Sequence, residues 1–252
     1  MKRFFMGILM AMIASQALAA GNLAGVTIYD RNERKTLPIH WHEGKAYVVG
    51  KPGNEYQVML RNQGGNDVLA VVSVDGVNVV TGETAAAAQS GYVLERGANL
   101  GVKGWRKSLS RTAAFYFTEL PDSYAARTGR PENVGVVGVA LFRRKVEEQP
   151  LALRESVEPR AKRAAPSADS AGAAAPSARA EEKSLGTGHG RNEASHARYV
   201  AFERATASPE EVITIYYDSR ANLVARGVIN QEPWREPQPF PARFTPDPPA
   251  RW

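Results

Sequence analysis

Residues 68–80 read VLAVVSVDGVNVV, and this stretch decides the fold. Val68–Val74 is almost wholly apolar and rich in β-branched side chains, which predicts a strand buried on both faces. The pair Asp75 and Gly76 separates it from a second β-branched run, Val77–Val80. An Asp-Gly pair in this position is typical of a type I′ turn, because both central residues of that turn need a positive φ. The stretch therefore predicts a β-hairpin whose first strand lies at the centre of a sheet.

The chain on either side of this hairpin continues the β pattern. From Gly25 to about Lys145, short runs rich in Val, Ile, Tyr and Phe alternate with turn residues. A second apolar run, Val134–Phe142, predicts another central strand, and the glycines inside it indicate a close backbone approach or a bulge. Roughly eight to ten short strands predict an all-β fold. We expect a jelly-roll-like or similar β-sandwich over residues 21–146, with a barrel as the alternative.

Two later stretches lack the side chains that a core needs. Residues 147–183 consist mainly of Ala, Pro, Ser and charged residues, which predicts a disordered linker. Residues 233–252 are rich in proline, which cannot donate to a β-ladder, so they predict an extended tail.

Between linker and tail, residues 184–232 show a β/α pattern. The sequence predicts strands over Tyr199–Arg204 and Val212–Tyr217, then a short helix capped by Asp218 and closed by Gly227. Such a segment holds too little apolar surface to fold alone. We therefore expect a small C-terminal β-hairpin plus helix that packs onto the sandwich.

The first twenty residues have the features of a secretory signal peptide. Lys2 and Arg3 precede a short apolar run, Phe4–Ile13, and the sequence ALA then provides a small-residue cleavage site. The mature chain is expected to begin near Ala20. The apolar run is too short to span a bilayer and no second one follows, so we expect no transmembrane span in the mature chain. This predicts a bacterial protein that is periplasmic or secreted.

Composition narrows the chemistry further. The chain has no cysteine, which excludes disulfides, thiolate catalysis and a cysteine-linked lipid anchor. Its net charge is +6, and because Lys2 and Arg3 leave with the signal peptide, the mature chain is near +4 (6 − 2). This mild charge favours weak attraction to anionic surfaces, and no nucleic-acid motif is present. The expected partner is an anionic envelope polymer or another envelope protein. The Gly-x-Ser-x-Gly, His-Glu-x-x-His and Ser-x-x-Lys signatures of common hydrolases are missing, so we expect a non-enzyme.

Four histidines form a candidate metal site. His40 and His42 stand two residues apart on a predicted strand, which places both imidazoles on one face. If the C-terminal segment folds over this strand, His189 and His196 complete a set that suits Zn²⁺ or Cu²⁺. A metal-binding protein or metal-dependent hydrolase is therefore the alternative function. The competing interpretation is two exposed strand histidines beside an unrelated loop, with no cofactor.

A cluster of basic residues around an indole forms a candidate binding surface. Lys103, Trp105, Arg106 and Lys107 lie within one short stretch. Charge and cation–π contact would let them hold an anionic glycan or a lipid headgroup. The alternative is a solvated strand with Trp105 in the core.

The glycine-rich run Gly186–Gly190 superficially looks like a phosphate-binding loop. It lacks the Gly-Lys-Ser/Thr ending, and no helix clearly starts behind it. We expect a flexible loop that carries His189.

Several phrases of the chain resemble a group of uncharacterised exported proteobacterial proteins. The phrases are VLAVVSVDGVNVVTGE (68–83), KGWRKS (103–108), SYAARTG (123–129), LGTGHGR (185–191) and YYDSRANLVARGVI (216–229). The resemblance implies a bacterial envelope location and a single design for both ordered blocks. It implies no activity, cofactor or site residue. Together, these observations predict an exported, envelope-associated binding or structural module.

Overall fold

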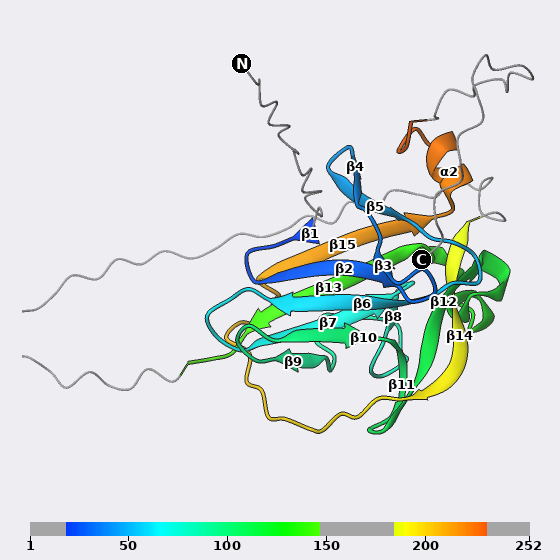
Figure 1. Ribbon diagram of the computed structural model, residues 1–252. Coiled ribbons are helices and arrows are strands. Elements are labelled where there is room, and N and C mark those ends of the chain that lie inside the picture. The colour runs from blue at the N-terminus through cyan, green and yellow to red at the C-terminus, as the bar shows by residue number, and fades with distance from the viewer. Residues whose placement is uncertain (1–18, 147–183, 231–252) are drawn as a thin grey trace, which may run out of the picture.

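A computed structural model describes residues 19–146 and 184–230. Over these residues the protein is an all-β sandwich of two packed sheets, as the sequence predicts (Figure 1). Residues 1–18 of the expected signal peptide, the expected linker at 147–183 and the expected tail at 233–252 lie outside the described residues. No helix in the described part of the chain is long and apolar enough to cross a membrane.

One sheet, sheet A, has eight strands. Its main path runs β1-β2-β6-β12-β11, and three further strands lie off this path: β3 pairs with β2, β10 with β6 and β14 with β12. The strands are β1 (Ala19–Ala20), β2 (Ala24–Asp30), β3 (Lys35–Thr36), β6 (Glu55–Asn62), β10 (Asn99–Val102), β11 (Gly104–Ser108), β12 (Arg111–Glu119) and β14 (Leu185–Ala194).

The other sheet, sheet B, has seven strands. Its main path runs β4-β5-β15-β13-β7-β8, and β9 pairs with β7. The strands are β4 (His40–His42), β5 (Lys45–Val49), β7 (Val68–Val74), β8 (Val77–Asn78), β9 (Tyr92–Leu94), β13 (Val136–Arg143) and β15 (Glu211–Asp218).

The predicted hairpin is confirmed. Asp75 has a φ of 52° and Gly76 a φ of 71°, as a type I′ turn requires. Strand β7 is buried along almost its whole length, between β13 on one side and β8 and β9 on the other. The second strand is shorter than expected, because Oδ1 of Asn78 accepts hydrogen bonds from the backbone N–H groups of Val80 and Thr81 and turns the chain.

The second apolar run forms β13, which pairs with β7 without a break in register. A Cβ at Gly138 would lie 2.8 Å from Oγ of Ser73, and Gly135 has a φ of 91°. Of the two interpretations for these glycines, close approach is therefore the correct one at Gly138.

The C-terminal segment packs onto the sandwich as expected, but it adds one strand to each sheet. Strand β14 pairs antiparallel with β12 in sheet A, and β15 lies between β13 and β5 in sheet B, parallel to β5. The expected strand at Tyr199–Arg204 is wrong: there the chain forms only an isolated bridge between Arg204 and Arg144.

The expectation of a flexible loop at Gly186–Gly190 is also wrong, because these residues lie inside β14. The glycines let the strand pass beneath large side chains. A Cβ at Gly188 would meet the Tyr116 ring at 2.2 Å, and one at Gly186 would meet Cβ of Ser123 at 2.6 Å. The glycine-rich pattern therefore reflects close packing.

Short helices complete the fold: α1 (Tyr124–Arg127), α2 (Arg220–Ala225), and 3₁₀ turns at Leu120–Asp122 and Pro131–Asn133. The expected cap of α2 shifts by one residue. Ser219 caps it by accepting from the N–H of Asn222, while the Asp218 carboxylate accepts from the N–H groups of Leu185 and Ser219. Gly227 follows the helix with a φ of 72°.

Four buried polar side chains connect the sheets inside the core. The hydroxyls of Tyr56 and Thr187 lie 2.6 Å apart, those of Thr187 and Tyr217 also 2.6 Å, and Tyr217 donates to Asp75 at 2.5 Å. Burial raises the pKa of Tyr56 and Tyr217 well above the ordinary tyrosine value, so both phenols stay protonated. Since the proton of Tyr217 goes to Asp75, Thr187 donates to Tyr217 and accepts from Tyr56.

Candidate functional site

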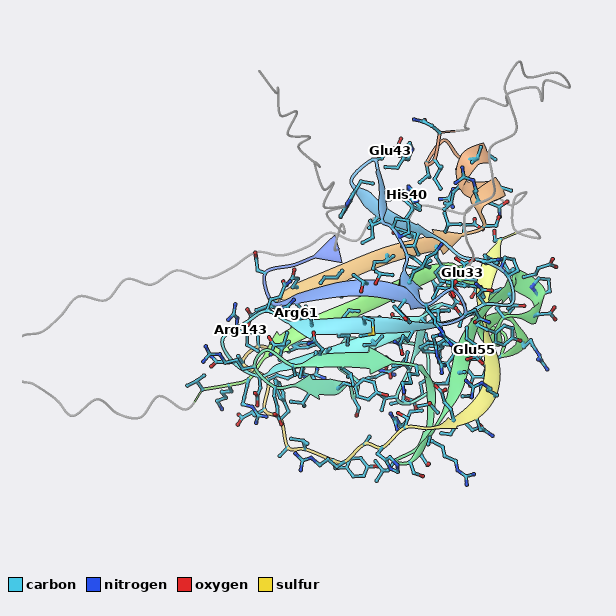
Figure 2. All side chains as sticks on the ribbon, in the orientation of Figure 1. Glu33, His40, Glu43, Glu55, Arg61 and Arg143 are labelled. Carbon is cyan, nitrogen blue, oxygen red and sulfur yellow. The ribbon has the colours of Figure 1, made fainter. Side chains whose placement is uncertain are left out.

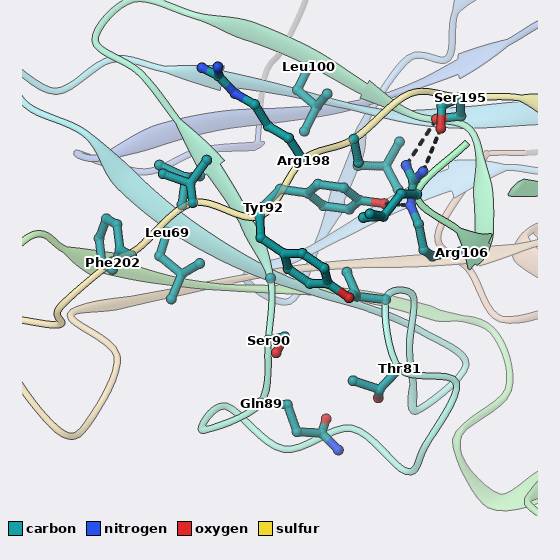
Figure 3. A pocket seen from close by; sticks show the side chains of 18 of the residues that line it. Leu69, Thr81, Gln89, Ser90, Tyr92, Leu100, Arg106, Ser195, Arg198 and Phe202 are labelled. Atoms are coloured by element: carbon teal, nitrogen blue, oxygen red, sulfur yellow. Dashed lines mark hydrogen bonds between the residues drawn. The ribbon is translucent and has the colours of Figure 1, made fainter. Parts of the chain in front are cut away.

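A groove of about 820 Å³ opens on one side of the sandwich, beside β9, β10 and β11. Its outer wall is the segment at 195–204, which follows β14 and which we call the strap (Figure 3). In Figure 1 the strap runs below β9 and β11 on its way to β15.

The groove lies where the chain passes from one sheet to the other. Strand β9 belongs to sheet B and pairs only with β7, whereas β10 belongs to sheet A and pairs only with β6, in the described part of the chain. A tight turn joins the two strands, in which the N–H of Ala98 donates to the carbonyl of Glu95. The chain thus crosses from one sheet to the other and leaves one edge of each strand unpaired beside the groove.

Arg106 fastens the first end of the strap. Its Nη1 donates to the carbonyl of Ser195 at 2.6 Å, and its Nη2 donates to Oγ of the same residue at 3.0 Å. Its Nε donates to the hydroxyl of Tyr92 at 3.2 Å, and the guanidinium lies 5.6 Å from the centre of that ring. One side chain therefore joins β11, β9 and the strap (Figure 3).

Two arginines fasten the other end. Arg204 donates to the carbonyl of Gln89 at 2.7 Å, and its guanidinium lies 4.2 Å from the centre of the Phe142 ring. Arg144 donates to the carbonyl of Ala201 at 3.2 Å and stacks on Phe202 at 4.7 Å. The strap is therefore held at both ends by planar guanidinium groups, each of which also contacts an aromatic ring.

The middle of the strap is open. The N–H of Ala197 donates to the carbonyl of Leu109, and the next backbone–backbone bond along the strap is accepted by the carbonyl of Glu203. In the part of the strap between Ala197 and Glu203, no backbone–backbone hydrogen bond forms with any described residue. Tyr199 is 90% exposed and Val200 48% exposed. A stretch of chain with two exposed apolar side chains is thus presented to solvent.

The groove is positively charged. Lys103, Lys107 and Arg198 are exposed on its walls, and none of them forms an ion pair with a carboxylate among the described residues. Of the two acidic residues that line the groove, Asp67 is paired with Arg144 at 3.3 Å. A site of this kind attracts anions, whereas its charge contributes little to the binding of neutral ligands.

Trp105 does not belong to this surface. It is 3% exposed, packs edge-to-face on Phe115 with ring centres 5.1 Å apart, and also contacts Tyr124. Alternation along β11 turns Trp105 toward the core and Arg106 toward the groove. The expected platform of an indole among cations is therefore wrong at Trp105, whereas Lys103, Arg106 and Lys107 all line the groove.

The structure does not bring the four histidines together. Among the described residues, no group of three His, Asp or Glu side chains is placed to hold a metal ion. His40 and His42 lie on β4, on the opposite side of the sandwich from the strap (Figure 2). His189 lies on β14 against the ring of Tyr124, and His196 lies in the strap.

Two of these imidazoles lie in surroundings that favour the neutral form. Burial, and then the charge of Arg220, lowers the pKa of His40. Burial, and then the charge of Lys107, lowers the pKa of His189. Because the two belong to different sheets, this shared property does not make them one site.

Sequence reasoning missed the contribution of the strap. Arg198 lines the groove, yet nothing in the sequence singles it out. The available signal is the strand-like run at Tyr199–Arg204, which the sequence predicts to pair with Val212–Tyr217 and which forms no strand in the structure. Comparison of the chain with family models, curated proteins and solved structures finds no match. The assignment of the site therefore depends on its own geometry.

Proposed function

We propose that this chain is an exported, envelope-associated binding module whose basic groove holds an anionic partner. The observation that carries the proposal is the set of three exposed cations, Lys103, Lys107 and Arg198, which line a groove and have no carboxylate partner in the described part of the chain. The features of the first twenty residues support the location, since they are typical of a secretory signal peptide.

The remaining arginines of the groove hold its outer wall in place. Arg106, Arg144 and Arg204 use their hydrogen bonds to hold the strap in place. Their guanidinium groups still add positive potential to the groove, but their positions are already fixed by the hydrogen bonds that hold the strap. A partner would therefore be attracted by all six cations and contacted most directly by Lys103, Lys107 and Arg198, which neither pair with a carboxylate nor hold the strap.

The test compares two triple variants that change the net charge equally. In the groove variant, Lys103→Glu, Lys107→Glu and Arg198→Glu reverse the unpaired cations. The control is Arg34→Glu, Arg127→Glu and Arg220→Glu, three exposed residues that do not line the groove. Binding of polygalacturonate and of poly-L-glutamate is measured by titration at several salt concentrations.

Wild type and control should bind at least one polyanion, and the groove variant should bind it roughly tenfold or more weakly, since each exposed ion pair contributes about 0.2–1 kcal/mol and three charge reversals replace attraction by repulsion. Binding should weaken as salt rises. The proposal is overturned if wild type binds neither polyanion, or if the control loses as much affinity as the groove variant.

A further inference from the structure

Three unpaired backbone edges meet at the groove. The outer edges of β9 and β10 face it, because each strand is paired on one side only in the described part of the chain. The third edge is the strap between Ala197 and Glu203, which makes no backbone–backbone hydrogen bond within the described residues. An unpaired extended edge is a ready template for another strand.

The sequence of the strap favours a strand that the fold does not form. Tyr199, Val200 and Phe202 are the aromatic and β-branched types that favour β structure. The connection from Ser195 to Glu210 is also longer than the roughly 12–15 residues above which loops without secondary structure are uncommon and are usually either functional or linker segments. A conflict between local preference and tertiary setting is expected at functional sites.

The strap is already held in place for such a partner. Arg106 holds its start, and Arg144 and Arg204 hold its end. The conformational entropy that a partner must remove is thereby reduced. A partner strand would also cover Val200 and the ring of Tyr199, which are otherwise exposed.

We infer that the strap is a docking strand for an extended, acidic polypeptide segment of another envelope protein. The inference rests on the proposed function and specifies the partner's chemistry. Acidity follows from Lys103, Lys107 and Arg198, which a segment beside the strap would contact. A polypeptide is favoured over a glycan, because only a polypeptide supplies alternating N–H and C=O groups that complete the open ladder.

The probe is an end-blocked heptapeptide in which Glu alternates with Val. Two analogues carry N-methyl groups on alternate amides, one along each edge of the extended peptide. Methylation leaves charge and side chains unchanged but removes the hydrogen-bond donors of one edge. The unmethylated peptide should bind wild type, and at least one analogue should bind tenfold or more weakly. Hydrogen exchange should show new protection at the amides of residues 198–202 on binding.

A variant of the strap gives an independent measurement. Val200→Pro removes one backbone donor from the open edge, and Ala207→Pro is the matched control, since Ala207 is exposed and does not line the groove. Val200→Pro should weaken peptide binding, and the control should not. If Val200→Pro fails to fold, the methylated peptides still decide the question with wild-type protein.

The outcomes separate this inference from the proposed function. If both analogues bind as tightly as the parent peptide, strand addition is wrong, although an anionic ligand still occupies the groove. If polygalacturonate binds in a groove-dependent way and the peptide does not, the partner is a glycan and this inference fails alone. If neither the peptide nor the polyanions bind, both proposals fail.

Discussion

The hydroxyl of Tyr217 donates a 2.5 Å hydrogen bond to Oδ1 of Asp75 in the interior of the sandwich. Tyr217 lies on β15, whereas Asp75 opens the turn between β7 and β8, 142 residues earlier in the chain. Asp75 also accepts from the N–H groups of Thr187 and Gly135, at 2.7 and 2.9 Å. The hairpin that decides the fold is therefore bonded to both strands of the C-terminal segment, which makes that segment part of the core.

This arrangement predicts a pH-dependent stability. Burial raises the pKa of Asp75 to about 6 from 3.8, although its hydrogen bonds lower it in part. The folded protein therefore holds this proton more tightly than the unfolded chain. The resulting stabilisation is fully present below pH 3.8 and is lost as the pH rises through about 6. At 1.36 kcal/mol for each pKa unit, the loss is about 3 kcal/mol.

Asp75→Asn should remove this slope from the free energy of unfolding, measured by urea denaturation at several pH values between 4 and 7. The matched control is Asp122→Asn, at an exposed carboxylate, which should keep the wild-type slope. A wild-type slope in Asp75→Asn would assign the titration to another group.

The close packing of β11 against β12 predicts a glycine that cannot be replaced by a larger residue. A Cβ on Gly104 would lie 1.9 Å from the carbonyl oxygen of Ala113, a backbone atom of the paired strand β12. Gly104→Ala should therefore destabilise the protein by more than about 2 kcal/mol. Gly65→Ala, where nothing lies within 4 Å of the added Cβ, should stay within about 0.5 kcal/mol of wild type. Thermal unfolding of both variants checks the contrast, and equal melting temperatures would contradict it.

Because Arg106 holds the start of the strap, replacing it should loosen the strap locally without unfolding the protein. Arg106→Lys keeps the charge but cannot reproduce the paired hydrogen bonds to Ser195 together with the contact to Tyr92. The amides of Ser195 and Ala197 donate to backbone carbonyls, so their exchange reports on the strap. Hydrogen exchange at these two amides should become roughly tenfold faster or more, with little change in melting temperature.

The control for this prediction is Arg198→Lys, since Arg198 has no hydrogen bond to the rest of the described chain. Exchange at the two amides should be the same in this variant as in wild type. Unchanged exchange in Arg106→Lys would show that the strap is held by other contacts.

Local patterns predicted much of the fold and little of the site. The type I′ turn at Asp75 follows from backbone sterics within two residues, and the sequence places it correctly. Trp105 could occupy either face of its strand, because alternation defines two faces but does not say which one meets the core. A glycine-rich run is typical of a loop, whereas in β14 the glycines are needed because Tyr116 and Ser123 lie against them.

By itself the sequence determined which segments form most of the strands, where the central hairpin lies and that the stretch around Arg106 is basic. Each of these properties depends on neighbours a few residues away. Only the tertiary structure decided that β14 and β15 enter different sheets, that the histidines lie apart, and that the strap closes one wall of a groove. The reason is that strand pairing joins residues more than a hundred positions apart, as Ile215 and Ala46 are, and no local preference specifies which edges meet.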